Sequence, residues 1–134
     1  MTLLVVGVSH RTAPVTLLDR VALVDGAAER LQVDLLASTH VAESLVLSTC
    51  NRVEIYAEVS KFHGGVLDVT DTLAKATGVD REELTPHLYV RYEDRAVQHM
   101  FEVAAGLDSM VVGEQQILGQ VRGALRSGQE LETI

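Results

Sequence analysis

The order of apolar and polar residues along the chain predicts four strands. Residues 3–8 are almost continuously apolar, which is typical of a central strand covered on both faces. Residues 43–49 and 53–59 alternate instead and are only a few residues apart, so we expect an antiparallel hairpin. The second strand of this hairpin has the cleanest alternation, which predicts one buried and one wetter face. A fourth strand is expected over residues 87–92.

Apolar residues at helical spacing predict helices between and after the strands. A capping residue at Asp25 starts the second helix, and Gly78 ends the third. The pair Gly64-Gly65 is expected to break the chain before that third helix begins. The expected helical ranges are 15–23, 25–38, 66–77, 94–105 and 114–134.

The last two predicted helices each have an apolar stripe. In the helix at 94–105, His99 lies roughly opposite the stripe, which argues against packing of His99 in the core. The final helix has no stop signal before Ile134, so the simplest interpretation is a helix cut partway that leads to more protein. The two stripes are Val97, Met100, Phe101, Ala104 and Ala105, and Ile117, Leu118, Val121, Leu125 and Leu131.

The order of these elements is βαββαβ, with two helices in the first crossover. It predicts an α+β fold, in which a ferredoxin-like antiparallel sheet with helices on one face is followed by two further helices, the last of them truncated. A length of 134 residues suits a single domain with enough chain for a hydrophobic core. We divide it into a βαββαβ core over about 1–92 and a helical extension over 93–134.

Composition and charge narrow the class of protein. The net charge is −8, so a wide nucleic-acid-binding surface is disfavoured, and any RNA contact through this domain should be small. No apolar run approaches the roughly 18 residues of a membrane span, and the N-terminus lacks the features of a signal peptide, so we expect a cytoplasmic protein without a membrane partner. With one cysteine and five scattered histidines, neither an internal disulfide nor a metal site is expected.

The only cysteine, Cys50, lies at the expected tip of the hairpin, in the stretch Ser48-Thr49-Cys50-Asn51-Arg52. A lone cysteine is most often a small buried hydrophobe. A polar turn at a strand end with an arginine nearby instead suits an exposed nucleophile, because a guanidinium favours the thiolate. Arg52 itself either pairs with Glu54 or Glu58 at the surface or binds a substrate carboxylate in a bidentate way.

Other polar residues have two interpretations each. His99 is an ordinary exposed helical histidine or, where its face turns toward the hairpin tip, a general acid or base near Cys50. His10, at the end of the first strand, is solvated or lines the same cleft. A polar cluster opens the last helix, either as an ordinary first turn or as hydrogen-bonding groups for an amino-acid-like ligand; it comprises Glu114, Gln115, Gln116 and Gln120. Gly7 is not followed by a GxGxxG pattern, so no nucleotide site is expected on this chain.

Three long motifs, in the family's order and at similar spacing, closely resemble the N-terminal catalytic domain of glutamyl-tRNA reductase. They are residues 7–15 (GVSHRTAPV), 47–56 (LSTCNRVEIY) and 106–121 (GLDSMVVGEQQILGQV). The resemblance covers essentially the whole chain and is weakest at 60–85 and after Gly123. Three long ordered motifs are far more specific than one short pattern.

The resemblance implies an enzyme that uses NADPH to reduce the glutamyl ester of charged tRNA(Glu) to glutamate-1-semialdehyde, the first committed step of tetrapyrrole (porphyrin and heme) biosynthesis. It also implies that Cys50 is the nucleophile that takes the glutamyl group as a thioester and that His99 assists the reaction. A thioester accepts hydride more readily than a free carboxylate. Among the substrate-binding positions we assign Arg52 to a substrate carboxylate and Glu114 to the α-ammonium group. The positions that match the family's substrate-binding residues are Thr49, Asn51, Arg52, Ser109, Glu114, Gln115, Gln116 and Gln120.

The family continues from the last helix into an NADPH-binding Rossmann-type domain and a helical dimerisation domain, and the resemblance places neither in these 134 residues. We therefore expect the NADPH site outside this chain, a homodimer for the full-length enzyme, and acyl transfer or slow ester hydrolysis as the activity of this chain alone. Expected partners are glutamyl-tRNA(Glu), the missing domains and, as a further candidate, the aminomutase that acts next.

Two other functions compete with this interpretation. One is a non-reducing module that binds glutamyl-tRNA or regulates the pathway. The other is a thiol hydrolase unrelated to tRNA, which the unbroken motif around Cys50 disfavours.

Overall fold

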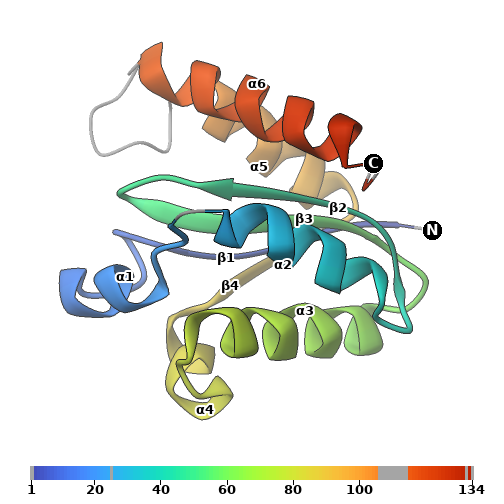
Figure 1. The fold of residues 1–134 in the computed structure, drawn as a ribbon, viewed down its shortest axis with the longest axis horizontal. Helices are drawn as coiled ribbons and strands as arrows, with labels where there is room; N and C mark the ends of the chain where they lie inside the picture. The colour runs from blue at the N-terminus through green and yellow to red at the C-terminus, as the bar shows by residue number, and fades with distance from the viewer. Residues whose placement is uncertain (1, 25, 106–114, 132, 134) are drawn as a thin grey trace.

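A single four-stranded antiparallel sheet, with strand order β2-β3-β1-β4, organises the fold (Figure 1). The structure, a computed structural model, describes residues 2–24, 26–105, 115–131 and 133, and only the backbone for 115–121 and 127. The strands are β1 (Thr2–Ser9), β2 (Val41–Ser48), β3 (Arg52–Val59) and β4 (Tyr89–Tyr92). This confirms the predicted α+β class, the βαββαβ order and the hairpin between β2 and β3.

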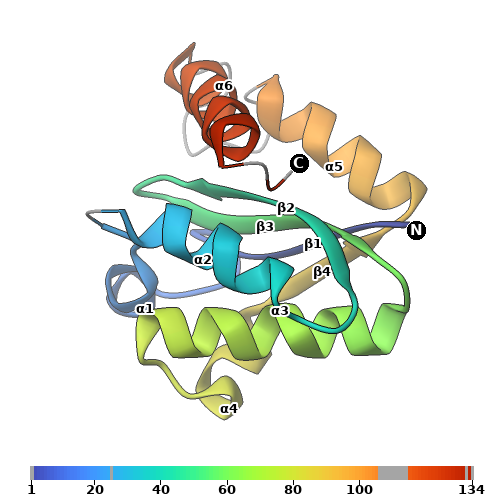
Figure 2. The same cartoon turned by 45° about the vertical axis from the view of Figure 1, so that its right-hand side comes forward.

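Helices cover both faces of the sheet. One face carries α2 (Ala27–Leu36) and α3 (Phe62–Thr77), and the other carries α5 (Asp94–Ala104) and α6 (Gln115–Glu130), as Figures 1 and 2 show. The two helices that follow the βαββαβ core therefore close its second face. The remaining short elements are α1 (Val15–Val21), α4 (Arg81–Leu84) and the 3-10 turn η1 (Thr85–His87).

Both central strands are buried on both faces. Leu4, Val6 and Val8 of β1 pack into the larger core with α2 and α3, whereas Val5 packs with Ala96 and Val103 on the side of α5. The prediction for β1 is thus confirmed. The predicted wetter face of β3 is wrong, because α5 and α6 cover it and convert its alternate polar residues into a buried layer.

The pair Gly64-Gly65 lies inside α3 and does not precede it as a break. A Cβ at position 64 would lie 2.2 Å from the ring of His40, and one at position 65 would lie 2.8 Å from Cβ of Val59. These glycines therefore permit close approach of the helix to its neighbours. The predicted end of α3 at Gly78 is confirmed, with a left-handed φ of 74°.

The predicted apolar stripe of α5 is wrong. Ala96, His99 and Val103 face the sheet and are buried, while Val97 and Phe101 are 43% and 69% exposed. The physical reason is the polar layer on β3, with which His99 forms a buried hydrogen bond. A hydrogen-bonded partner thus sets the rotation of this helix, against its hydrophobic pattern.

Two helix ends also differ from the prediction. Helix α2 begins at Ala27 with Gly26 at its N-cap position, and Asp25, the predicted cap, lies outside the described residues. Helix α6 ends at Glu130, not at Ile134, and its first described residue is Gln115. On the predicted stripe of α6, Leu125 and Leu131 are 44% and 37% exposed, and the side chains at 117, 118 and 121 lie outside the described part.

Thr133, which follows α6, and Gln32 of α2 form hydrogen bonds with the outer edge of β2. The backbone N–H of Ser44 donates to the carbonyl of Thr133 at 2.7 Å, and the side chain of buried Gln32 accepts from the N–H of Val46 at 3.0 Å. The N–H of Thr133 in turn donates to the carbonyl of Gly128 at 2.8 Å. These contacts satisfy donors that an edge strand would otherwise leave open.

Within the described part of the chain, each helix is either too short or too polar to span a membrane.

The packing of α3 gives a stability prediction. Gly65→Ala places a methyl group against the buried Val59, so we expect a loss of about 1–3 kcal/mol in the free energy of unfolding, measured by urea denaturation. The matched control is Gly123→Ala in α6, where a Cβ would meet open space. Helix propensity predicts that this change stabilises by up to about 1 kcal/mol. A Gly65→Ala variant as stable as the parent would contradict the close approach.

Candidate active site

Cys50 is an exposed free thiol at the tip of the β2–β3 hairpin. Its turn is held by its own neighbours, since the N–H of Thr49 donates to the carbonyl of Arg52 at 2.8 Å and the N–H of Asn51 donates to Oγ1 of Thr49 at 3.1 Å. The N–H of His10 also donates to the carbonyl of Asn51 at 2.9 Å. The end of β1 thereby fixes the position of the turn, and the sulfur is left accessible.

Behind the turn, alternate residues of β3 form a buried polar layer. Arg52, Glu54 and Tyr56 point to the side of α5, and Glu54 is fully buried. Its carboxylate accepts hydrogen bonds from Tyr56 Oη at 2.6 Å, from Tyr89 Oη and from His99 Nε2, and lies 3.3 Å from Nη1 of Arg52. A buried carboxylate is tolerable only with such pairing.

A glycine in the middle strand makes the contact between Tyr89 and Glu54 possible. Gly7 of β1 is paired with Glu54 on one side and with Tyr89 on the other. The Tyr89 ring crosses β1 at this point, and a Cβ at position 7 would lie 2.6 Å from its Cζ and Oη atoms. The first of the three sequence motifs therefore contributes a backbone position that only glycine fits.

Opposing effects set the pKa of Glu54. Burial raises the pKa of this carboxyl, but the hydrogen bond and charge of His99, with the hydrogen bonds of Tyr56 and Tyr89, lower it further than burial raises it. The net pKa is therefore below the usual value of 4.5. Burial, followed by the negative charge of Glu54, raises the pKa of Tyr56, so its phenol stays protonated and donates.

The pairing with Glu54 assigns chemistry to His99. Because an ionised carboxylate can only accept, the hydrogen bond places a proton on Nε2, so in the neutral form of the ring Nδ1 is the unprotonated nitrogen. The Tyr89 ring lies against the imidazole with centroids 5.3 Å apart. Glu54 and Tyr89 together hold His99 in one tautomer and one orientation.

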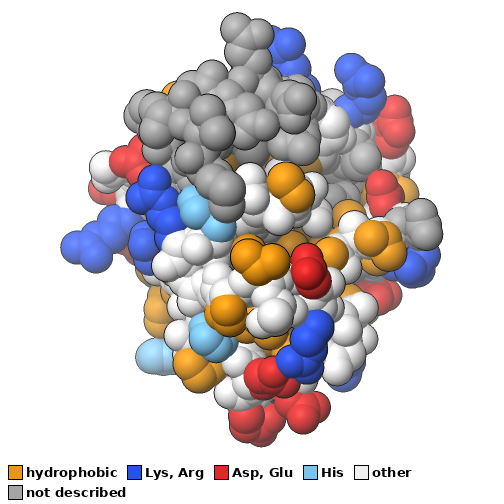
Figure 3. All heavy atoms as spheres, turned by 90° about the vertical axis from the view of Figure 1, so that its left-hand side faces the viewer, with side chains coloured by type: hydrophobic (Ala, Val, Ile, Leu, Met, Phe, Trp, Pro, Cys, Tyr) orange, Lys and Arg blue, Asp and Glu red, His pale blue; other side chains and the backbone are white. Residues whose placement is uncertain are grey.

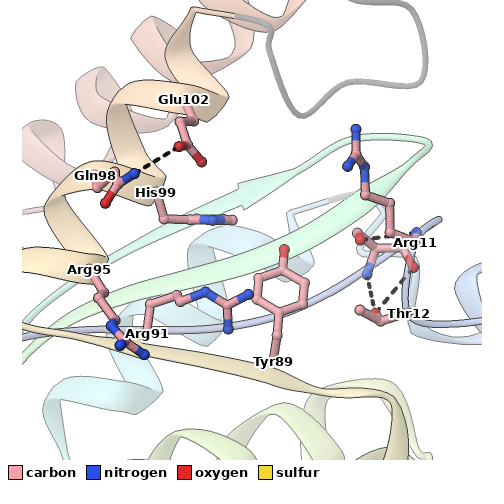
Figure 4. Close-up of a pocket in the computed structure, with 9 residues that line it drawn as sticks. Arg11, Thr12, Tyr89, Arg91, Arg95, Gln98, His99 and Glu102 are labelled. Atoms are coloured by element: carbon pink, nitrogen blue, oxygen red, sulfur yellow. Dashed lines mark hydrogen bonds between the residues drawn. The ribbon is translucent and has the colours of Figure 1, made fainter.

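A pocket of about 350 Å³ opens beside this layer. Figure 4 shows Tyr89 and Arg91 of β4 on one side and Gln98, His99 and Glu102 of α5 on the other. Its lining residues are Ser9, Arg11, Thr12, Tyr89, Arg91, Arg95, Gln98, His99 and Glu102. The pocket and the Cys50 turn are connected through the end of β1, because Ser9 is paired with Arg52.

The family is identified by comparison with known proteins. The sequence model described as "Glutamyl-tRNAGlu reductase, N-terminal domain" matches residues 6–134. The chain belongs to this family. It is 58% identical over 133 residues to glutamyl-tRNA reductase of Streptomyces avermitilis, covering 99% of this chain and 23% of the relative. It is 55% identical over 134 residues to that of Thermobifida fusca, covering 100% of this chain and 28% of the relative.

A solved structure agrees with this assignment. Glutamyl-tRNA reductase from Methanopyrus kandleri has a TM-score of 0.73 and 35% identity, covering 98% of this chain and 29% of that chain. The present chain thus spans about a quarter of the length of the reductases it matches.

Several predicted site residues of this reductase domain fall within the described structure. Thr49 and Asn51 are half-buried in the Cys50 turn, and Arg52 and His99 are buried and joined through Glu54. The predicted pairing of Arg52 with Glu54 is confirmed, but the pair is buried and not at the surface, and the exposed interpretation of His99 is wrong. Ser109 and Glu114 lie outside the described residues, and only the backbone is described for Gln115, Gln116 and Gln120.

The sequence interpretation missed three members of the site. Glu54 and Tyr56 stand at the polar positions of an alternating strand, which were assigned to a wetter face, and Tyr89 is on a strand of four residues. The signal that could have found them is the glycine at position 7 together with the register. His10, proposed for the same cleft, does not line the pocket, although its Nδ1 is buried without a hydrogen-bond partner among the described residues.

Across the described ranges no group of three or more His, Cys, Asp or Glu side chains could hold a metal ion.

The buried carboxylate leads to a prediction about acid stability. Because the folded-state pKa of Glu54 is depressed, its contribution is complete above the unfolded value near 4.5 and is lost as pH falls through the folded value. Glu54→Gln should therefore lower the free energy of unfolding by about 2 kcal/mol or more at pH 7, and the gap to the parent should close below pH 4.5.

The control for this prediction is Tyr56→Phe, which removes one hydrogen bond and keeps the charge. We expect a smaller loss, about 1 kcal/mol. Urea denaturation between pH 3 and pH 8 measures both variants. A gap between the parent and Glu54→Gln that stays constant through this range would show that the carboxylate does not carry the contribution.

Proposed function

We propose that this chain is the catalytic, substrate-binding domain of an NADPH-dependent glutamyl-tRNA reductase, in which Cys50 takes the glutamyl group from tRNA(Glu). The observation that carries the proposal is an exposed thiol at a turn whose backbone is held by hydrogen bonds, with the end of β1 joining this turn to the pocket that His99 lines. The similarity over the whole chain to proteins named glutamyl-tRNA reductase supports the substrate.

The proposed step is an acyl transfer. The sulfur of Cys50, after loss of its proton, attacks the carbonyl carbon of the glutamyl ester, and the bond between that carbon and the ribose oxygen breaks. The ribose oxygen leaves with a proton, and the products are a thioester and uncharged tRNA. His99 takes the thiol proton at Nδ1 and returns it to the ribose oxygen, while Glu54 acts as a positioning residue.

The described residues do not fit a dinucleotide. NADPH sites of the Rossmann type lie at the carboxyl ends of parallel strands, at a glycine-rich turn, whereas this sheet has only antiparallel pairings. We therefore assign the NADPH site to another part of the enzyme. The hydride that turns the thioester into glutamate-1-semialdehyde, and any homodimer or aminomutase contact, belong to that larger protein.

The substrate contacts remain those that the resemblance implies. Thr49 and Asn51 flank the sulfur, which suits recognition of groups close to the ester. Arg52 is shared between Glu54 and the proposed substrate carboxylate, and a fork with five donors can serve both.

The nucleophile has a direct test. Incubation of the chain with glutamyl-tRNA(Glu), followed by intact-protein mass spectrometry, should show one glutamyl adduct that Cys50→Ser lacks. Circular dichroism establishes that the variant is folded, which its exposed position favours. Absence of the adduct from the parent, or an equal adduct on the variant, would refute the proposal.

The proposed binding of a substrate carboxylate by the Arg52 guanidinium can be tested separately. Arg52→Lys keeps the charge but not the fork, so we expect the rate of adduct formation at limiting glutamyl-tRNA to fall about tenfold or more. The matched control is Arg20→Lys, which alters an exposed pair with Glu83 and should leave the rate unchanged. Urea denaturation of both variants separates lost recognition from lost stability. Equal rates for parent and Arg52→Lys would exclude recognition by the fork.

A further inference from the structure

Positive charge gathers in the pocket beside His99, although the chain carries a net charge of −8. Arg11, Arg91 and Arg95 line it, against one carboxylate, Glu102, which accepts a hydrogen bond from Gln98 at 3.2 Å. Figure 3, which views the end of the sheet with the hairpin tip, shows a group of Lys and Arg side chains at the left edge, while charged side chains of both signs are spread over the rest of this face. The pocket is a local basic site on an acidic surface.

Two of these arginines are presented to solvent. Arg91 is exposed and lies over the ring of Tyr89 with its Cζ 5.5 Å from the centroid, while Nη1 donates to the carbonyl of Val90 at 3.0 Å. Arg95 is exposed and, among the described residues, has no ion pair. Like charges that share one pocket repel, so an anion bound between them is favoured.

The remaining lining adds neutral hydroxyl groups. Ser9 and Thr12 reach the pocket from the end of β1, where the N–H of Ser9 donates to Oγ1 of Thr12 at 3.1 Å. The same segment contacts the Cys50 turn through His10. A ligand in this pocket therefore lies next to the strand end that fixes the turn. Arginine forks with adjacent hydroxyl groups are the set that proteins use for phosphate groups.

We propose that Arg91 and Arg95, together with Arg11, bind phosphodiester groups at the single-stranded 3′ end of the tRNA while its glutamyl ester lies at Cys50. This inference rests on the proposed function, because the ester is attached to the terminal ribose, and the nearest phosphates are the 5′ phosphodiester of that ribose and the one that precedes it. A pocket of about 350 Å³ is in the range that holds a group of nucleotide size. A small phosphate site of this kind is compatible with an RNA substrate on an acidic domain, because the protein needs positive charge only where it binds the acceptor end of the tRNA.

The first experiment does not depend on the cysteine. Titration of the ¹⁵N-labelled chain with the trinucleotide CCA should shift the amide signals of Thr12, Arg91 and Arg95, and inorganic phosphate at equal concentration should shift them less. The double variant Arg91→Gln/Arg95→Gln should weaken CCA binding about fivefold or more, while Lys75→Gln on α3 makes a charge change on the other face and leaves it unchanged. Equal binding by the double variant, or equal shifts with phosphate alone, would overturn the inference.

The second experiment separates this inference from the proposed function. Rates of Cys50 acylation are measured with glutamyl-tRNA(Glu) and with a small glutamyl thioester that has no phosphate. The double variant should lower the ratio of the tRNA rate to the thioester rate about fivefold or more, and the deficit should shrink with added salt. An unchanged ratio overturns the phosphate site even where acylation occurs. Absence of acylation from both donors in the parent overturns the proposed function, and CCA binding then decides the site by itself.

Discussion

The packing of α5 against the sheet depends on the hydrogen bonds and the ion pair of the buried Glu54 carboxylate. Its partners come from three elements, since Arg52 and Tyr56 share β3 with it, Tyr89 is on β4, and His99 is on α5. Removal of any partner leaves part of a charge unsatisfied in a region with little access to water, which costs more than a surface contact would. The cluster therefore specifies how β4 and α5 meet β3, and the apolar contacts of Val5, Ala96 and Val103 follow that arrangement.

This constraint explains why α5 contradicts its own hydrophobic pattern. Periodicity favours burial of Val97 and Phe101, yet both are exposed while His99 faces the sheet. The free energy lost by leaving two apolar side chains in water is of the order of a few kcal/mol. An unpaired buried carboxylate would cost at least as much. The hydrogen bond thus decides the rotation of the helix, and it also places a titratable ring at the wall of the pocket.

Sequence reasoning succeeded where a local pattern is compatible with only one kind of structure. The continuous apolar run of β1, the left-handed Gly78 and the hairpin around Cys50 were all predictable from local pattern. It failed where the environment of a residue is set by residues far apart in the chain. Polar alternation in β3 looks the same whether water or α5 covers it, and the glycines at 64 and 65 look like a break until His40 and Val59 are placed against them. Membership of Glu54 and Tyr89 in the site required the register across Gly7.

The pairing of Arg52 with Glu54 alters the electrostatic effect that the sequence predicted for this arginine at the Cys50 thiol. The sequence suggested a guanidinium near Cys50 that would favour the thiolate, but this guanidinium is buried and lies 3.3 Å from Glu54. A paired arginine and glutamate have nearly equal and opposite fields at a distance, so their net effect on an exposed sulfur is small. In the proposed function His99 is the base that takes the thiol proton, and its hydrogen bond to Glu54 fixes the tautomer in which Nδ1 is the unprotonated nitrogen. The same carboxylate that holds the fold together on this face therefore determines which nitrogen is available to take the proton.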